Sequence, residues 1–197
     1  MQKTLWISVA ATVWLACVVA GLSVVWSYEN GAGVAATPSA QWPAASRLVP
    51  ASDRPTLVFV AHPQCTCTRA SLGELAEALA RTATPPRTYV VFIKPSSMPD
   101  GWEKSGLWSA AGHLPNTTIV RDDDGREAES FGAATSGQTF VYDAAGTLQF
   151  SGGITASRAH AGDNDGRASV VALLNRLEKK RASTNVYGCS LFASAKS

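Results

Sequence analysis

Two cysteines, Cys65 and Cys67, stand one residue apart, shortly after His62. A cysteine thiolate is both a nucleophile and a soft metal ligand. Two such thiols at close spacing can exchange with a disulfide, and together with an imidazole they can bind Cu(I) or zinc. The pattern His62-x-x-Cys65-x-Cys67 therefore points to two chemistries, dithiol-disulfide exchange and metal binding.

The cysteine pair lies where a predicted strand passes into a predicted helix. Residues 56–61 form a short apolar, β-branched run typical of a buried strand, which ends at His62-Pro63. Residues 68–81 place leucines three and four positions apart, as on one face of an amphipathic helix. The N-terminus of a helix favours a thiolate, because its unpaired N–H groups and its dipole attract negative charge.

This position assigns roles to the two thiols. We expect Cys65, exposed ahead of the helix, to attack, and Cys67 to resolve the mixed disulfide. His62 and Arg69 are placed to add positive charge that stabilises the thiolate. A Cys65–Cys67 disulfide would close a small ring and would be more easily reduced than an ordinary structural bridge.

The order of the remaining elements predicts an α/β domain. Strand, helix and strand in succession indicate a parallel pair with a right-handed crossover. A hairpin is predicted later because a turn that closes with Gly146 separates two short apolar runs. The expected elements after the first helix are a strand at 89–93, a helix at 100–111, a strand at 117–120, a helical turn at 126–131, hairpin strands at 139–142 and 147–150, and a helix at 168–180.

The N-terminal segment predicts a membrane anchor. Residues 5–26 are apolar and uncharged, long enough for a bilayer core of about 30 Å. Lys3 favours the inner side, so we expect a single-pass inner-membrane protein whose C-terminal domain faces the periplasm or exterior. The expected divisions are an anchor at 1–28, a flexible linker rich in Ala, Gly, Ser and Pro at 29–52, a domain at 53–181 and a tail at 182–197 containing Cys189.

Composition excludes several classes. The 197 residues carry a net charge of only +2, so no basic surplus is available to bind nucleic acid. Four cysteines are too few for a disulfide scaffold.

Three stretches carry a family resemblance: HPQCTCTRASLGEL, SGGITASRAHAGDNDGR and the terminal YGCSLF. Together with the order of elements they resemble the thioredoxin superfamily, and more narrowly the RedB group of bacterial thioredoxin-like proteins. The resemblance implies a three-layer fold with a central mixed sheet, and an oxidoreductase that needs no cofactor and exchanges with protein thiols or disulfides. Gly137, which follows Ser136, occupies the place of the proline that faces the cysteines in thioredoxins, and this departure raises the metal alternative.

Further polar residues are expected near the cysteine turn, because a hairpin returns the chain to that edge of the sheet. Arg158 and His160 are the candidates there, with His160 able to act as proton shuttle or ligand. Cys189 is a candidate resolving thiol, a further soft ligand or a spectator. Two alternatives to exchange stay open. One is a Cu(I)-binding chaperone of the Sco type that uses Cys65, Cys67, His62 and His160, and the other is a thioredoxin-like fold that only binds a partner.

Overall fold

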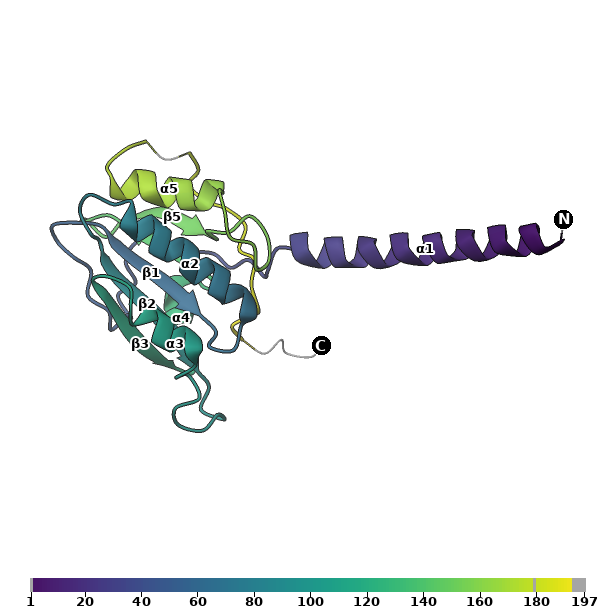
Figure 1. Cartoon of the computed structure of the whole chain (residues 1–197). Coiled ribbons are helices and arrows are strands. Elements are labelled where there is room, and N and C mark those ends of the chain that lie inside the picture. The colour runs from purple at the N-terminus through teal and green to yellow at the C-terminus, as the bar shows by residue number, and fades with distance from the viewer. Residues whose placement is uncertain (1, 179, 193–197) are drawn as a thin grey trace. The chain divides into compact units, whose positions relative to one another are not determined.

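The computed structural model describes residues 2–178 and 180–192, and the chain divides into two units, Met1–Gly31 and Ala32–Ser197. The first unit contains helix α1 (Gln2–Asn30), drawn in purple in Figure 1. The apolar side chains of this helix are exposed. By length and composition α1 can cross a membrane, a test that an N-terminal signal sequence also passes.

The second unit is built on a five-stranded mixed sheet with the order β3-β2-β1-β4-β5. Strands β1, β2 and β3 run parallel, whereas β4 and β5 form an antiparallel hairpin that pairs with β1. The bounds are β1 (Thr56–Ala61), β2 (Arg87–Lys94), β3 (Thr117–Asp123), β4 (Gln138–Tyr142) and β5 (Leu148–Gly152). The first strand is therefore central and is buried along its whole length.

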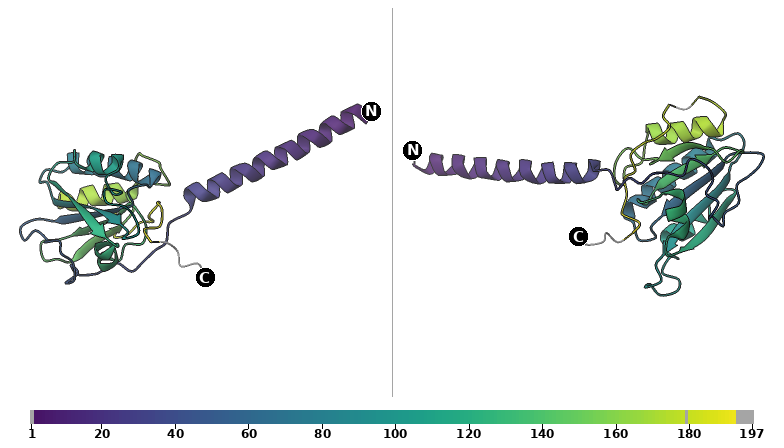
Figure 2. Two further views of the ribbon diagram at one scale, coloured as in Figure 1. Left: turned by 90° about the horizontal axis from the view of Figure 1, so that it is seen from below. Right: turned by 180° about the vertical axis from the view of Figure 1, so that it is seen from behind.

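Helices cover both faces of this sheet. Three helices lie on one face of the sheet (Figures 1 and 2): α2 (Thr66–Ala80), α3 (Gly106–Ala111) and α5 (Asp165–Leu174). Their apolar side chains form one buried cluster with Phe59 and Phe92. Helix α4 (Arg126–Phe131) packs on the other face against Val60. The predicted three-layer α/β arrangement with a central mixed sheet is confirmed.

The predicted boundaries differ from the observed ones mainly at helices. Strand β1 and helix α4 coincide with the predicted ranges, and α2 begins slightly earlier, at Thr66. The helix expected over 100–111 is confined to Gly106–Ala111, where Ser105 accepts the Leu107 N–H as an N-cap. Helix α5 ends at Leu174, since Arg176 adopts a left-handed conformation with φ of 59°. Lys179 of the predicted range lies outside the described residues.

The segment expected as a flexible linker at 29–52 differs most from its prediction. Its residues from Gly33 onward belong to the folded unit, and Leu48 is buried. The Trp42 ring stands edge-on to Phe131 and Tyr142, at centroid distances of 5.0 Å and 5.2 Å. The segment is held because its few apolar side chains find long-range partners, which local composition does not reveal.

The predicted tail at 182–197 is also part of the folded unit, as far as it is described. Ala182 accepts the Ser151 N–H at 3.1 Å, and Val186 accepts the Gly33 N–H at 2.8 Å. Residues 193–197 lie outside the described residues.

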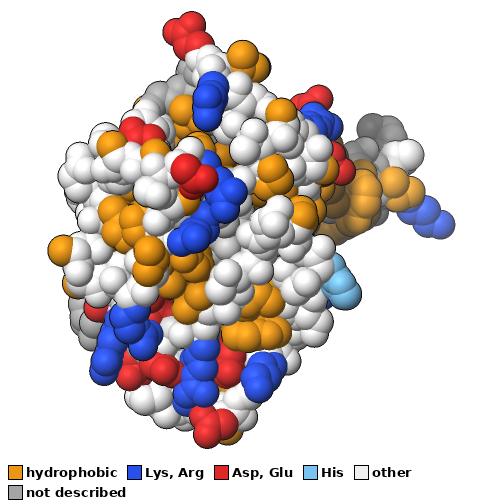
Figure 3. Space-filling model, turned by 90° about the vertical axis from the view of Figure 1, so that its left-hand side faces the viewer, with side chains coloured by type: hydrophobic (Ala, Val, Ile, Leu, Met, Phe, Trp, Pro, Cys, Tyr) orange, Lys and Arg blue, Asp and Glu red, His pale blue; other side chains and the backbone are white. Residues whose placement is uncertain are grey.

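Charged side chains of both signs are interspersed on the face of the molecule drawn in Figure 3. That face therefore presents no broad field of one sign, in keeping with the small net charge of +2.

Candidate active site

The cysteine turn joins the end of the central strand to the start of α2. Cys65 is the N-cap residue of the helix, with an extended backbone at φ of −84° and ψ of 114°, and Cys67 lies in the first turn. The Cys65 N–H donates to the His62 carbonyl at 3.1 Å. Both thiols are buried, with 1% of Cys65 and 6% of Cys67 exposed. The expectation of an exposed Cys65 is therefore wrong, because other parts of the chain cover this thiol.

Hydrogen bonds favour the thiolate form of Cys65. Burial alone would raise the pKa of this thiol, but donors from Cys189 and Thr68 outweigh it and lower the pKa below its ordinary value. Each of the two residues contributes through both its backbone N–H and its side chain. The Cys189 N–H donates to the Cys65 Sγ atom at 3.4 Å. Cys65 is thus the thiol at this turn that is prepared to act as a nucleophile.

A chain of hydroxyl groups supports Thr68. The His62 backbone N–H donates to the Ser136 Oγ atom at 2.7 Å, and Ser136 Oγ lies 2.6 Å from Thr68 Oγ1. The Thr68 hydroxyl donates a hydrogen bond to the Cys65 sulfur. In the Thr68–Ser136 pair the Ser136 hydroxyl is therefore the donor and the Thr68 oxygen the acceptor. Ser136 and Thr68 are both buried, so water does not compete for these bonds.

Gly137 fixes the loop that carries Ser136. Its φ is 92°, a conformation that residues with a Cβ rarely adopt, and its N–H donates to the Val60 carbonyl at 2.8 Å. A Cβ at this position would also lie 3.0 Å from the Ser71 hydroxyl of α2. Glycine therefore lets the loop before β4 approach the cysteine turn closely.

His62 lies beside the turn but supplies no positive charge at neutral pH, since burial lowers the pKa of its imidazole further. Its Nδ1 atom accepts the Gln64 N–H at 3.2 Å, which leaves the ring proton on Nε2. The ring packs edge-on against Trp102, at a centroid distance of 5.3 Å. Pro63 is buried next to it. These contacts fix the turn, and the charge predicted for His62 is absent.

The remaining candidate residues divide into two groups. Arg69 and His160 are exposed, and the His160 Nδ1 atom lies 2.9 Å from the carbonyl of Arg158. The largest contributions that lower the Cys65 pKa come from Cys189 and Thr68 rather than from Arg69. Arg158 does reach the site, because its Nη1 atom donates to the Gly188 carbonyl at 2.7 Å.

The loop between β5 and α5 is built largely to hold α2. Glu74 of α2 is buried and forms an ion pair with Arg167, and it also accepts the Gly162 N–H at 2.7 Å. Asn164 caps α5 by accepting the Arg167 N–H at 2.8 Å, so its role is structural. This network connects the helix that starts at the cysteines to α5.

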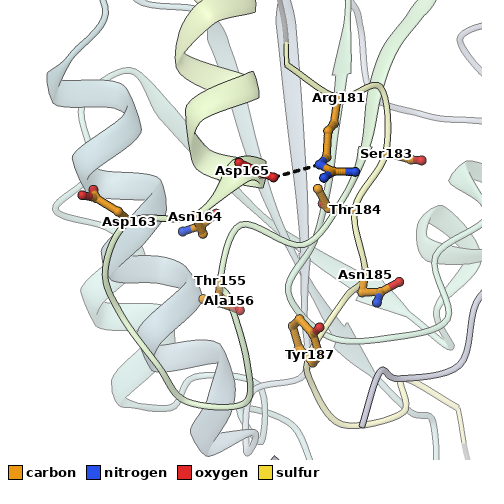
Figure 4. A pocket seen from close by; sticks show the side chains of 11 residues that line it. Thr155, Ala156, Asp163, Asn164, Asp165, Arg181, Ser183, Thr184, Asn185 and Tyr187 are labelled. Atoms are coloured by element: carbon orange, nitrogen blue, oxygen red, sulfur yellow. Dashed lines mark hydrogen bonds and ion pairs between the residues drawn. The ribbon is translucent and has the colours of Figure 1, made fainter. Parts of the chain in front are cut away.

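A polar pocket of about 590 Å³ lies between this loop and the C-terminal segment (Figure 4). Asp165 and Arg181 form an ion pair at 2.8 Å along its wall, and Tyr187 stands at its other end. No cysteine contributes to the lining of this pocket.

The described side chains are not arranged as a metal-binding site. Within 2–178 and 180–192, no group of three or more His, Cys, Asp or Glu side chains is placed to hold a metal ion. The Nδ1 atom of His62 already accepts a hydrogen bond from the Gln64 N–H. The Nδ1 atom of His160 lies within hydrogen-bond distance of the Arg158 carbonyl oxygen. The positions of these side chains do not favour the Cu(I) alternative.

No family model matches the chain, and no curated protein matches it. Among solved structures, an uncharacterised conserved protein from Geobacillus kaustophilus has a TM-score of 0.60 at 18% identity, over 85% of this chain and 95% of that chain. A hypothetical protein from Sinorhizobium meliloti has a TM-score of 0.58 at 17% identity, over 83% of this chain and 100% of that chain. At these identities the likeness shows a shared fold.

A pneumococcal exposed lipoprotein thioredoxin from Streptococcus pneumoniae is also similar, with a TM-score of 0.42 at 16% identity, over 64% of this chain and 87% of that chain. Because this score is low, the fold class rests on the chain's own topology. A parallel β1-α2-β2 unit followed by the β4-β5 hairpin and α5, with the cysteines at the first strand-to-helix turn, defines a thioredoxin-like fold.

Sequence reasoning singled out every cysteine of the site but missed Thr68. A hydroxyl residue in the first turn of a helix that begins with a cysteine is the signal that was available, because such a group can donate to the preceding sulfur.

Proposed function

We propose that this protein is a membrane-anchored thiol-disulfide oxidoreductase related to the RedB group, with Cys65 as its nucleophile. The Cys65 thiolate attacks a disulfide of a protein substrate and forms a mixed disulfide. A second thiol of the site then releases the substrate, and the candidates for this step are Cys67, by its C-x-C spacing, and Cys189. The chemistry requires no cofactor, and the substrates are protein thiols or disulfides.

The observation that carries this proposal is the environment of Cys65. This thiol lies at the N-cap of α2, where hydrogen bonds from Cys189 and Thr68 lower its pKa despite burial. A cysteine with a purely structural role in an apolar core has its pKa raised instead, and remains a thiol.

An apolar cavity beside the turn supports a protein substrate. It has a volume of about 420 Å³ and adjoins His62, with Trp102, Met98 and Leu191 in its lining. Apolar and aromatic walls of this kind suit a hydrophobic side chain of a polypeptide.

The test measures reduction of a disulfide-bonded peptide by dithiothreitol through the full chain in detergent. Cys65→Ser is expected to abolish turnover, because no thiolate remains at the N-cap. The matched control is Cys17→Ser, which removes a thiol in α1 and should leave turnover unchanged. Full turnover by Cys65→Ser would overturn the proposal.

The proposed location is the inner membrane, with α1 as a single-pass anchor and residues 32–192 in the periplasm or exterior. The length and apolarity of α1 and the position of Lys3 support this arrangement. In whole cells, a membrane-impermeant maleimide should modify a cysteine introduced by Ala144→Cys, in the hairpin turn, before the cells are lysed. Modification only after lysis would contradict the orientation.

A further inference from the structure

The C-terminal strap, residues 187–192, lies directly on the cysteine turn. Its Cys189 carbonyl accepts the Ser136 N–H at 2.9 Å, and its Leu191 N–H donates to the Ala134 carbonyl at 2.9 Å. Ser190 forms an antiparallel bridge with Thr135 between these two bonds. The strap is therefore paired, as a very short strand, with the loop that precedes β4.

Two further contacts position the strap at its beginning. Arg158 donates to the Gly188 carbonyl at 2.7 Å, and Gly188 packs so closely on the Ser136 backbone that a Cβ would collide with its carbonyl oxygen. Leu191 is buried in the apolar cluster on the α4 side of the sheet. The strap is thus held on both sides of Cys189, and the thiol between the two anchors is aimed at the turn.

The contacts between sulfurs favour Cys189 over Cys67 as the partner of Cys65. The Cys189 N–H donates to the Cys65 Sγ atom at an N···S distance of 3.4 Å, and the Cys189 side chain also contributes to the lowered pKa of Cys65. Cys67 instead follows Cys65 by two positions at the start of a helix, where residues so spaced do not face one another. A Cys65–Cys67 bridge would require the first turn of α2 to rearrange.

We propose that Cys189 is the resolving thiol, which forms a disulfide with Cys65 and releases the substrate. This inference rests on the proposed function of Cys65. The Cys65 thiolate first displaces one sulfur of the substrate disulfide, which leaves as a thiolate and takes up a proton. The Cys189 thiol then loses its proton and its sulfur attacks Cys65, so that the second substrate sulfur leaves as a thiol. The two cysteines have together given two electrons to the substrate, and an external dithiol restores them.

The electrostatics of the pair fit this sequence of steps. Burial, the hydrogen bond with Cys65 and the nearby charges of Cys65 and Cys67 raise the pKa of Cys189 to about 12. The thiol of Cys189 therefore keeps its proton while Cys65 is the thiolate. Once the Cys65 sulfur is in a mixed disulfide it carries no charge. The part of the rise in the Cys189 pKa that came from the charge of Cys65 is then gone, while the part that comes from burial remains.

The experiment oxidises the reduced full chain with one equivalent of oxidised glutathione, in a Cys17→Ser background. Samples are quenched with acid, free thiols are alkylated, and the peptides are mapped by mass spectrometry. We expect a Cys65–Cys189 disulfide with Cys67 alkylated. In Cys189→Ser the glutathione adduct on Cys65 should persist at least tenfold longer, whereas in Cys67→Ser it should decay as in the parent.

A shifted thiol provides the matched control. Combining Cys189→Ser with Ser190→Cys moves the sulfur by one residue along a paired strand, where neighbouring side chains point to opposite faces. This variant should not restore rapid release. A Cys65–Cys67 disulfide, or rapid release in Cys189→Ser, would overturn the role of Cys189 while leaving the proposed function intact. Failure of Cys65 to form any glutathione adduct would overturn both.

Discussion

Two segments without regular secondary structure lie along the sheet, and they differ in how extensively they are fixed. Residues 33–51 are held by backbone hydrogen bonds, such as that from the Trp42 N–H to the Gly146 carbonyl at 2.7 Å, and by side chains, with the Trp42 ring packed against Phe131 and Tyr142 and with Leu48 buried. The strap at 187–192 is held by two backbone hydrogen bonds to the loop before β4, together with the buried side chain of Leu191 and the partly buried side chain of Phe192. The first segment contains no cysteine, and the second contains Cys189.

This difference indicates which segment can move. Opening residues 33–51 would expose aromatic surface, at a cost comparable to a large part of the stability of a domain. Opening the strap breaks a few backbone bonds, which water replaces, and exposes the side chain of Leu191 and the already partly exposed ring of Phe192. The strap is therefore the segment suited to leave Cys65 when a substrate arrives.

The largest expected effect is that of Trp42→Ala. Loss of the ring contacts, and of its hydrogen bond to the Leu48 carbonyl, should lower the free energy of unfolding by about 3 kcal/mol. Chemical denaturation of the chain measures this change. Val49→Ala is the control, because that side chain is exposed, and it should change the stability by less than about 0.5 kcal/mol. Similar effects of both substitutions would contradict a structural role for the ring contacts.

Leu191→Ala should release the strap without unfolding the domain. Truncation of this buried side chain removes about 2 kcal/mol, which corresponds to roughly a thirtyfold increase in strap opening. The rate of Cys65 alkylation by iodoacetamide at fixed pH is the measurement, since this thiol is covered. An unchanged rate would show that the strap does not limit access to Cys65. Exposed Asn185→Ala, outside the strap, serves as a control and should leave the rate as it is.

Thr68→Val should have a smaller effect, on the pH dependence of the same alkylation. The hydrogen bonds of Thr68 lower the Cys65 pKa, so removing its hydroxyl raises the pKa and moves the rate profile to higher pH. At neutral pH the rate should fall by roughly tenfold, as for loss of a hydrogen bond to a charged group worth about 1.5 kcal/mol. Arg69→Gln should leave the profile in place. A shift with Arg69→Gln alone would mean that charge, rather than hydrogen bonding, controls this thiol.

The regular elements of the domain were predictable from the sequence because their signals are local. The apolar, β-branched run of β1 and the leucine spacing of α2 depend only on neighbouring residues, and both elements form where expected. The packing of residues 33–51 could not be predicted in the same way. Trp42 is held by residues that follow it by about a hundred positions in the chain, and nothing adjacent to it indicates those partners.

The site was predictable in its composition but not in its contacts. The cysteine pair, Ser136 and Gly137 follow from motif and order, whereas the pairing of Cys189 with Cys65 depends on the path of the strap. The burial of carboxylate side chains could not be predicted from the sequence either. Asp122 is buried and accepts the Glu127 and Ala128 N–H groups at 2.9 Å, although it begins a run of three aspartates of the kind usually found in exposed turns.

The pairing of residues 182–184 with the end of β5 has a consequence for the kinetics of exchange. The Ala182 carbonyl accepts from Ser151, and the Thr184 hydroxyl donates to the Gly153 carbonyl at 2.7 Å, so the chain is anchored only a few residues before Cys189. A thiol on so short an arm has an effective concentration of millimolar or more at Cys65. A free thiol in solution must reach a comparable concentration to compete for the mixed disulfide. Substrate intermediates would therefore be short-lived, and a covalent complex should accumulate only when the sulfur of Cys189 is removed.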